Sequence, residues 1–126
     1  YKFNILDTPG YFDFSGEVDE AMSVADGAII VVSGKSGIEA GTEKAWELCE
    51  KYHLPRMFFV TDMDIDDVSY RKAIEDLTAV YGKKIAPFNM PIRDDGKFTG
   101  YVNVIQQKAF RYKAIGVVEP TDIPDY

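Results

Sequence analysis

Ala28-Ile29-Ile30-Val31-Val32 is the stretch that decides the fold, because five consecutive apolar residues, four of them β-branched, form a short run. This pattern is typical of a strand in a parallel sheet that is covered on both faces. Met57-Phe58-Phe59-Val60 is a second run of the same kind. Between the two runs, apolar residues recur at helical spacing: Ala45, Leu48, Cys49 and Tyr52. The order strand, helix, strand predicts an α/β fold.

The segments on either side extend this pattern. Lys2–Leu6 favours a strand that ends at the turn Asp7-Thr8-Pro9-Gly10. A helix is expected after that turn, with an apolar stripe at Phe14, Val18, Ala21, Met22 and Ala25. A third helix is expected where Asp66 and Asp67 precede the stripe Tyr70, Ile74, Leu77 and Tyr81.

The character of the chain changes from Ile85 onward. The Asp94-Asp95-Gly96 turn and the alternating run Tyr101–Ile105 indicate antiparallel β structure. We therefore predict two parts, residues 1–84 and residues 85–126.

Composition excludes several classes of protein. The 126 residues are 46% hydrophobic and 28% charged, which is typical of globular domains. The net charge is −7, which disfavours binding a polyanion over the whole surface. The longest apolar run is Ala28–Val32, whereas a membrane span needs about 20 residues, so no membrane partner is expected. The single cysteine, Cys49, predicts a reducing, cytoplasmic location. Because the chain starts at Tyr1 without Met, we expect a piece of a longer protein.

Ligands of parallel α/β sheets bind at the carboxyl ends of the strands. Three loops are expected there, at residues 7–11, 33–41 and 61–64. In the first, the Asp7 carboxylate can meet Mg²⁺ and the Gly10 backbone N–H can meet a phosphate. A plain strand-to-helix turn is the alternative.

The other two loops carry weaker signals. Gly34-Lys35-Ser36 is not a phosphate-binding P-loop, because Ile29 stands where the pattern needs a glycine. In Thr61-Asp62-Met63-Asp64 a carboxylate can accept two N–H bonds from a guanine edge, or the acids can cap the next helix. The one histidine, His53, and one cysteine give no transition-metal site.

One basic and aromatic cluster remains near the end of the chain, at Lys108, Phe110, Arg111, Tyr112 and Lys113. Such a cluster can contact RNA, although a solvated strand face is the more ordinary interpretation.

Together these features resemble a translational GTPase, most closely elongation factor G. Asn4 to Gly10, with Phe12-Asp13-Phe14 and Gly16-Glu17-Val18, is similar to the strand, loop and helix of switch II. The central and later parts continue the resemblance in order, at Asp26-Gly27-Ala28, Gly37-Ile38-Glu39, Thr42-Glu43, Trp46, Leu54-Pro55-Arg56, Met90-Pro91-Ile92, Phe98-Thr99-Gly100-Tyr101-Val102 and Lys108-Ala109.

The resemblance implies a partial P-loop-GTPase-type parallel sheet with flanking helices, plus a small C-terminal antiparallel β insertion. Residues 1–84 would belong to the G domain and 85–126 to its insertion. It implies GTP or GDP, Mg²⁺ and the ribosome as ligands and partner of the parent protein, which would drive ribosomal translocation. Asp7 would meet Mg²⁺ through water, and Gly10 the γ-phosphate. Asp64 would read the guanine; the other implied nucleotide-binding residues are Pro9, Thr61 and Asp62.

Two positions depart from the family pattern. Tyr11 stands where the family has the His that orients the attacking water, and a phenol stays neutral at pH 7. Asp62 stands where the guanine motif Asn-Lys-x-Asp has Lys. A degenerate ribosome- or protein-binding module without GTP hydrolysis therefore stays open, as does, at lower rank, a ribosome-protection or release-factor GTPase.

The family's P-loop has no counterpart in these residues, so we expect the chain alone to be catalytically inactive and to bind no nucleotide. The strand leading into that P-loop would lie between Lys2–Leu6 and the Ala28 strand. We therefore expect one of two outcomes. Lys2–Leu6 pairs directly with Gly27–Ser33, or the chain forms a homodimer through the exposed sheet edge.

Overall fold

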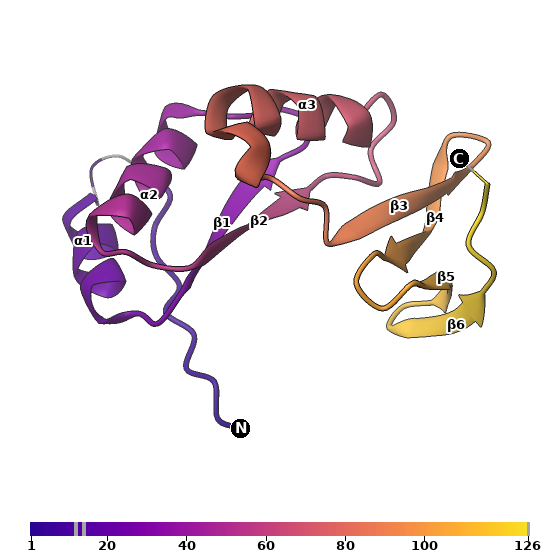
Figure 1. Cartoon of the computed structure of the whole chain (residues 1–126), viewed down its shortest axis with the longest axis horizontal. Helices are drawn as coiled ribbons and strands as arrows, with labels where there is room; N and C mark the ends of the chain where they lie inside the picture. Colours follow the sequence, from indigo (N-terminus) through magenta and orange to yellow (C-terminus); the bar gives the residue numbers. More distant parts are fainter. Residues whose placement is uncertain (12, 14, 126) are drawn as a thin grey trace. The chain divides into compact units, whose positions relative to one another are not determined.

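The computed structural model describes residues 1–11, 13 and 15–125. Phe12 and Phe14, used above for the first helix and for the resemblance, lie outside the described residues. The chain forms two compact units, Tyr1–Thr61 and Asp62–Tyr126, which are described separately (Figure 1). The predicted functional boundary after residue 84 stays a prediction.

The first unit contains the predicted strand–helix–strand arrangement. Helix α1 spans Ser15–Val24, strand β1 Ala28–Ser33, helix α2 Ala40–Lys51 and strand β2 Arg56–Thr61. The two strands are parallel, with Ala28 opposite Arg56 and Ser33 opposite Thr61. The prediction of a parallel α/β sheet with flanking helices is confirmed.

The core of this unit lies on one face of the sheet. Ile30, Val32 and Cys49 are buried, and Met22 of α1 and Trp46 of α2 pack against them. The other face is open: Ile29 is 64% and Val31 62% exposed. The expectation that this strand is covered on both faces is therefore wrong here, because the side chains from both helices pack on the face that carries Ile30 and Val32.

The N-terminal segment differs from its prediction. Residues 1–10 form no strand, and Phe3 and Ile5 are 85% and 90% exposed. Among the described residues β1 pairs in its sheet only with β2, so Lys2–Leu6 does not pair with Gly27–Ser33. A β-favouring sequence becomes a strand only when a neighbour accepts its backbone hydrogen bonds, and none is in register here.

The second unit begins with a helix and ends with an antiparallel sheet. Helix α3 spans Tyr70–Tyr81 and is followed by the 3₁₀ turn η2, Gly82–Lys84. The strands are β3 (Asn89–Asp94), β4 (Lys97–Asn103), β5 (Lys108–Ala114) and β6 (Val117–Thr121). They pair in the order β3-β4-β5-β6 around the buried cluster Ile92, Val102 and Ala109. The predicted antiparallel C-terminal part is confirmed.

The start of α3 corrects a third expectation, that Asp66 and Asp67 cap this helix. The residue that caps the helix is Ser69, whose hydroxyl accepts a hydrogen bond from the Lys72 amide at 3.3 Å. Asp66 and Asp67 lie too far upstream, because an N-cap must directly precede the first helical residue. No helix in the described part of the chain is long and apolar enough to cross a membrane.

Candidate functional site

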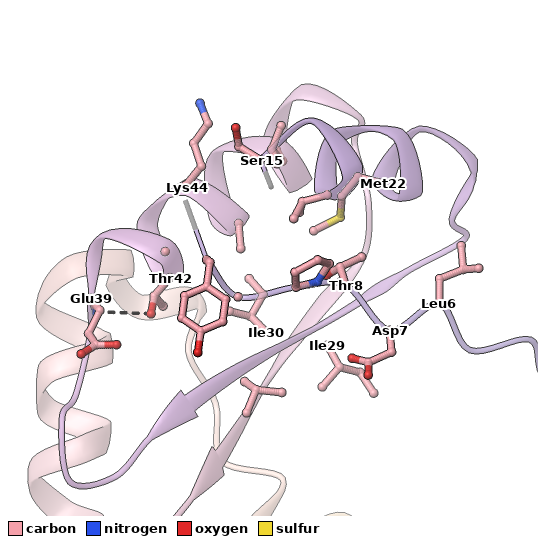
Figure 2. A pocket seen from close by; sticks show the side chains of 18 residues that line it. Leu6, Asp7, Thr8, Ser15, Met22, Ile29, Ile30, Glu39, Thr42 and Lys44 are labelled. Carbon is pink, nitrogen blue, oxygen red and sulfur yellow. Dashed lines mark hydrogen bonds between the residues drawn. The ribbon is translucent and has the colours of Figure 1, made fainter. Parts of the chain in front are cut away.

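A cavity of about 390 Å³ lies in the first unit, beside the outer edge of β1. Figure 2 shows Asp7 on one side of it and Glu39 and Thr42 on the other. The lining residues come from the N-terminal segment, α1, β1 and the start of α2: Leu6, Asp7, Thr8, Pro9, Gly10, Tyr11, Ser15, Val18, Met22, Ile29, Ile30, Val31, Glu39, Gly41, Thr42, Lys44, Ala45 and Leu48.

The loop from Asp7 to Tyr11 forms one wall of this cavity, so four of the predicted site residues lie together: Asp7, Pro9, Gly10 and Tyr11. Asp7 and Gly10 are exposed, Pro9 is half-buried, and the Tyr11 side chain is 78% exposed. A Cβ placed on Gly10 would meet no heavy atom within 4 Å. The backbone of Gly10 is therefore open to a ligand.

The opposite wall begins at Glu39, inside the expected loop 33–41, but Thr42 and Lys44 were not among the predicted site residues. There the Glu39 amide donates to the Thr42 hydroxyl oxygen at 3.3 Å, and the Thr42 amide donates to the Glu39 carbonyl at 2.9 Å. Lys44 is the one basic side chain in the described lining, and its Nζ lies 3.3 Å from Glu47. The available signal was the spacing Glu39-x-x-Thr42 before an apolar stripe, which marks a helix start.

Asp7 offers one exposed carboxylate, the kind of group that a hydrated Mg²⁺ uses. The described residues contain no group of three or more His, Cys, Asp or Glu side chains placed to hold a metal ion. Mg²⁺ usually keeps several waters and uses one or two carboxylates together with substrate phosphates. Asp7 can therefore supply an acceptor to a coordinated water, while phosphate oxygens supply the inner ligands.

The second loop is a structural turn. The Ser33 hydroxyl oxygen accepts the amides of Lys35 and Ser36, both at 3.2 Å, and the Ser33 carbonyl accepts the Gly37 amide at 2.8 Å. These amides are already engaged within the turn. This geometry agrees with the exclusion of a P-loop at Gly34-Lys35-Ser36.

In the third loop, Thr61 ends β2 and ties it to β1. Its hydroxyl donates to the Val32 carbonyl at 3.4 Å, and its own carbonyl accepts the Gly34 amide at 3.0 Å. Asp62 and Asp64 belong to the second unit.

The acidic residues that follow have separable roles. Asp62 and Asp67 have φ angles of 60° and 70°, in the left-handed region that Asp tolerates better than most residues. Asp64 lies between these two turn positions, is exposed, and has an ordinary φ. Asp66 is likewise exposed with an ordinary φ, so the geometry leaves the carboxylates of Asp64 and Asp66 both accessible to a ligand.

The basic and aromatic cluster on β5 favours the ordinary interpretation. Arg111 is hydrogen-bonded to Asp94, and Lys113 forms an ion pair with Glu119. The ring of Phe110 stacks on that of Tyr101, with centroids 5.4 Å apart. Two of the three cations are therefore paired within the sheet, which leaves little free charge for RNA phosphates.

Comparison with known proteins places the chain among translation factors. Residues 1–119 match the family model described as "Elongation factor Tu GTP binding domain". The chain is 34% identical over 128 residues to "Ribosome-releasing factor 2, mitochondrial" of Culex quinquefasciatus. It is 39% identical, with a TM-score of 0.86, to a protein of known crystal structure from Thermus thermophilus. Each match covers 94% of this chain and 17% of the relative, so the chain spans about a sixth of their length.

Proposed function

This chain belongs to the elongation factor Tu GTP-binding domain family, and from that premise we propose that it works within an elongation factor G-like GTPase that acts on the ribosome. Residues 1–84 form the part of the G domain from switch II through the guanine motif to the helix after it. Residues 85–126 form part of an insertion in that domain. The observation that carries the proposal is the switch-II-like loop Asp7–Tyr11, which lines a cavity beside β1.

GTP or GDP and Mg²⁺ are the proposed ligands of the complete protein. Asp7 holds a water of the Mg²⁺ shell, and the Gly10 amide donates to the γ-phosphate when it is present. Asp64 accepts the N–H groups of the guanine edge, while Pro9, Thr61 and Asp62 shape the two loops. The open backbone at Gly10 and the exposed carboxylates of Asp7 and Asp64 support these roles.

The 126 residues alone are not expected to hydrolyse GTP. Positioning by a nest of backbone amides around the β-phosphate supplies most of the catalysis in phosphoryl transfer. In the one Gly-Lys-Ser turn, the Lys35 and Ser36 amides donate to the Ser33 hydroxyl instead, and the Gly34 amide donates to the Thr61 carbonyl. Activity is therefore a property of the complete protein that contains this chain, and its proposed location is the cytoplasm.

Tyr11 decides between the two main functional candidates. A neutral phenol can hold a water but accepts its proton poorly, so Tyr11 supports slower hydrolysis than a His would. We expect ribosome-stimulated GTP turnover by the complete protein, and about a hundredfold faster turnover after Tyr11→His, at the low end for a general base. Tyr112→His, in the second unit and outside the cavity lining, is the control.

The outcomes separate the candidates. Turnover that depends on ribosomes supports the elongation-factor interpretation. Ribosome binding without GTP turnover, in the wild type and in Tyr11→His alike, would replace it by a binding module that has lost hydrolysis.

For the isolated chain we also propose a homodimer through β1. Its outer edge is free of a strand partner among the described residues, and Ile29 and Val31 beside it are exposed. Such edges recruit a second strand. Light scattering should give a dimer mass that Val31→Lys returns to monomer; a monomeric wild-type chain would refute this proposal.

A further inference from the structure

Arg93 joins the antiparallel sheet to the loop that carries Asp64. Its Nη2 donates to the Met63 carbonyl at 2.5 Å and to the Val68 carbonyl at 3.0 Å. Its Nη1 donates to the Gly96 carbonyl at 2.7 Å, within the β3–β4 turn. All of these residues lie in the second unit. One guanidinium therefore anchors a loop that begins 31 positions before it in the sequence.

The loop consists of two consecutive turns. In the first, the Ile65 amide donates to the Asp62 carbonyl at 3.2 Å; in the second, the Val68 amide donates to the Ile65 carbonyl at 3.4 Å. Met63 lies inside the first turn and Val68 ends the second. Because a single nitrogen of Arg93 binds both carbonyls, it closes the two turns on each other.

The pairing of β3 with β4 is irregular next to Arg93. The pairing of β3 with β4 shifts register between Ile92 and Arg93, which is the mark of a β-bulge. Bulges redirect a side chain and are frequent next to functional sites. Arg93 is half-buried, whereas its neighbour Asp94 is exposed. The extra residue at this irregularity is Thr99 of β4, and beside it Arg93 reaches the carbonyls of Met63 and Val68 from within a strand.

We propose that Arg93 is a positioning residue for base recognition: it holds the peptide at Met63 so that the adjacent carboxylate of Asp64 meets both N–H groups of guanine. This inference rests on the proposed function, in which Asp64 reads the base. The planar fork of Arg suits several carbonyl acceptors at once, whereas the ammonium of Lys is a point charge.

The test compares GTP with ITP, which lacks the 2-amino group and so offers Asp64 one N–H instead of two. Dissociation constants are measured for the complete protein as wild type, R93A, R93K and the exposed-arginine control R71A. A charge-assisted hydrogen bond is worth roughly tenfold or more in affinity. We expect R93A to bind GTP about tenfold more weakly with little change for ITP, R93K to be intermediate, and R71A to match wild type.

Two further readouts separate positioning from a general structural role. The turnover rate at saturating GTP should stay within about twofold of wild type in R93A, because the phosphates are held elsewhere. Amide exchange of Ile65 and Val68 in the 126-residue chain should become faster in R93A and unchanged in R71A, since these amides close the two turns.

The results distinguish the two proposals. If wild type prefers GTP over ITP and R93A keeps that preference, the Arg93 inference is overturned and the proposed function stands. If wild type binds neither nucleotide, the proposed function is wrong, and so is the role of Arg93 in base recognition. If the amides of Ile65 and Val68 exchange at the wild-type rate in R93A, Arg93 does not hold the two turns together.

Discussion

Gly100→Ala should disrupt the antiparallel sheet of the second unit. A Cβ on Gly100 would lie 2.2 Å from the Phe110 carbonyl oxygen and 3.0 Å from the Arg111 Cα, and real Cβ atoms essentially never come closer than 3.0 Å. These are backbone atoms of β5, so a side-chain rotation cannot relieve the clash. β4 and β5 must separate instead.

The energetic cost follows from what that separation affects. Overpacking alone costs about 1–3 kcal/mol. The pairs Tyr101–Phe110 and Val102–Ala109 come next along the ladder, and Val102 and Ala109 belong to the buried cluster with Ile92. With one ladder hydrogen bond weakened at about 1 kcal/mol, the total is about 2–4 kcal/mol. A unit of this size has roughly 3–10 kcal/mol of stability, so the loss is large.

Amide exchange measured by NMR is the assay, because it reports each strand separately. Amides of β4 and β5 should lose protection in Gly100→Ala. Gly41→Ala is the control: it lies in α2 with no atom within 4 Å of the added Cβ, and should stabilise by about 0.4–1 kcal/mol. Protection of Val102 equal to wild type in Gly100→Ala would refute the register Gly100–Arg111.

Three further predictions concern the first unit. Leu48 is 5% exposed, so Leu48→Ala should lower the free energy of unfolding by about 2–5 kcal/mol. Urea unfolding followed by the fluorescence of the single tryptophan, Trp46, measures this change. A loss below about 0.5 kcal/mol would contradict the packing. Burial raises the pKa of the Cys49 thiol, so a thiol reagent should label it only on unfolding, and native labelling at the rate of a free thiol at pH 8 would oppose this. The hydrogen bond from Lys51 holds the pKa of the Asp19 carboxyl below 3.8, so its stabilising effect is present above that pH and is lost as the pH falls through the folded-state pKa. When the free energy of unfolding is measured against pH in the acid range, Asp19→Asn should therefore lose less stability than wild type, with Glu20→Gln as control. Identical curves for Asp19→Asn and wild type would argue against the pair.

Much of the fold could be predicted because its signals are local. The apolar runs of β1 and β2 and the stripe of α2 are patterns of adjacent residues, and the Asp95-Gly96 turn uses residues that adopt positive φ, here 50° and 80°. The segment Lys2–Leu6 was predicted wrongly because a strand depends on a partner that its own sequence does not specify. The exposure of Ile29 and Val31 has the same origin, since burial depends on what covers a face.

The candidate site divides in the same way. The loop Asp7–Tyr11 could be singled out from the sequence, and it lines the cavity although Lys2–Leu6 forms no strand before it. Its opposite wall at Glu39, Thr42 and Lys44 could not, because the closing of a cavity depends on how a helix start packs against a distant segment. Arg93 carries no local signal at all, since its contacts with Met63 and Val68 arise from a bulge and a turn far apart in sequence.

The replacement of Lys by Asp62 can be interpreted through Arg93. The family pattern has Lys where this chain has Asp62, and the loop carries four carboxylates in six residues. Arg93 returns a positive charge to the same loop, but its nitrogens lie on the carbonyls of Met63 and Val68. Arg93 therefore binds the backbone of the loop, and in the proposed site it does not replace stacking along the base. Since hydrogen bonds to Asp64 set the choice of base and stacking adds affinity for any purine, the proposed site should keep its preference for guanine and bind every purine nucleotide more weakly.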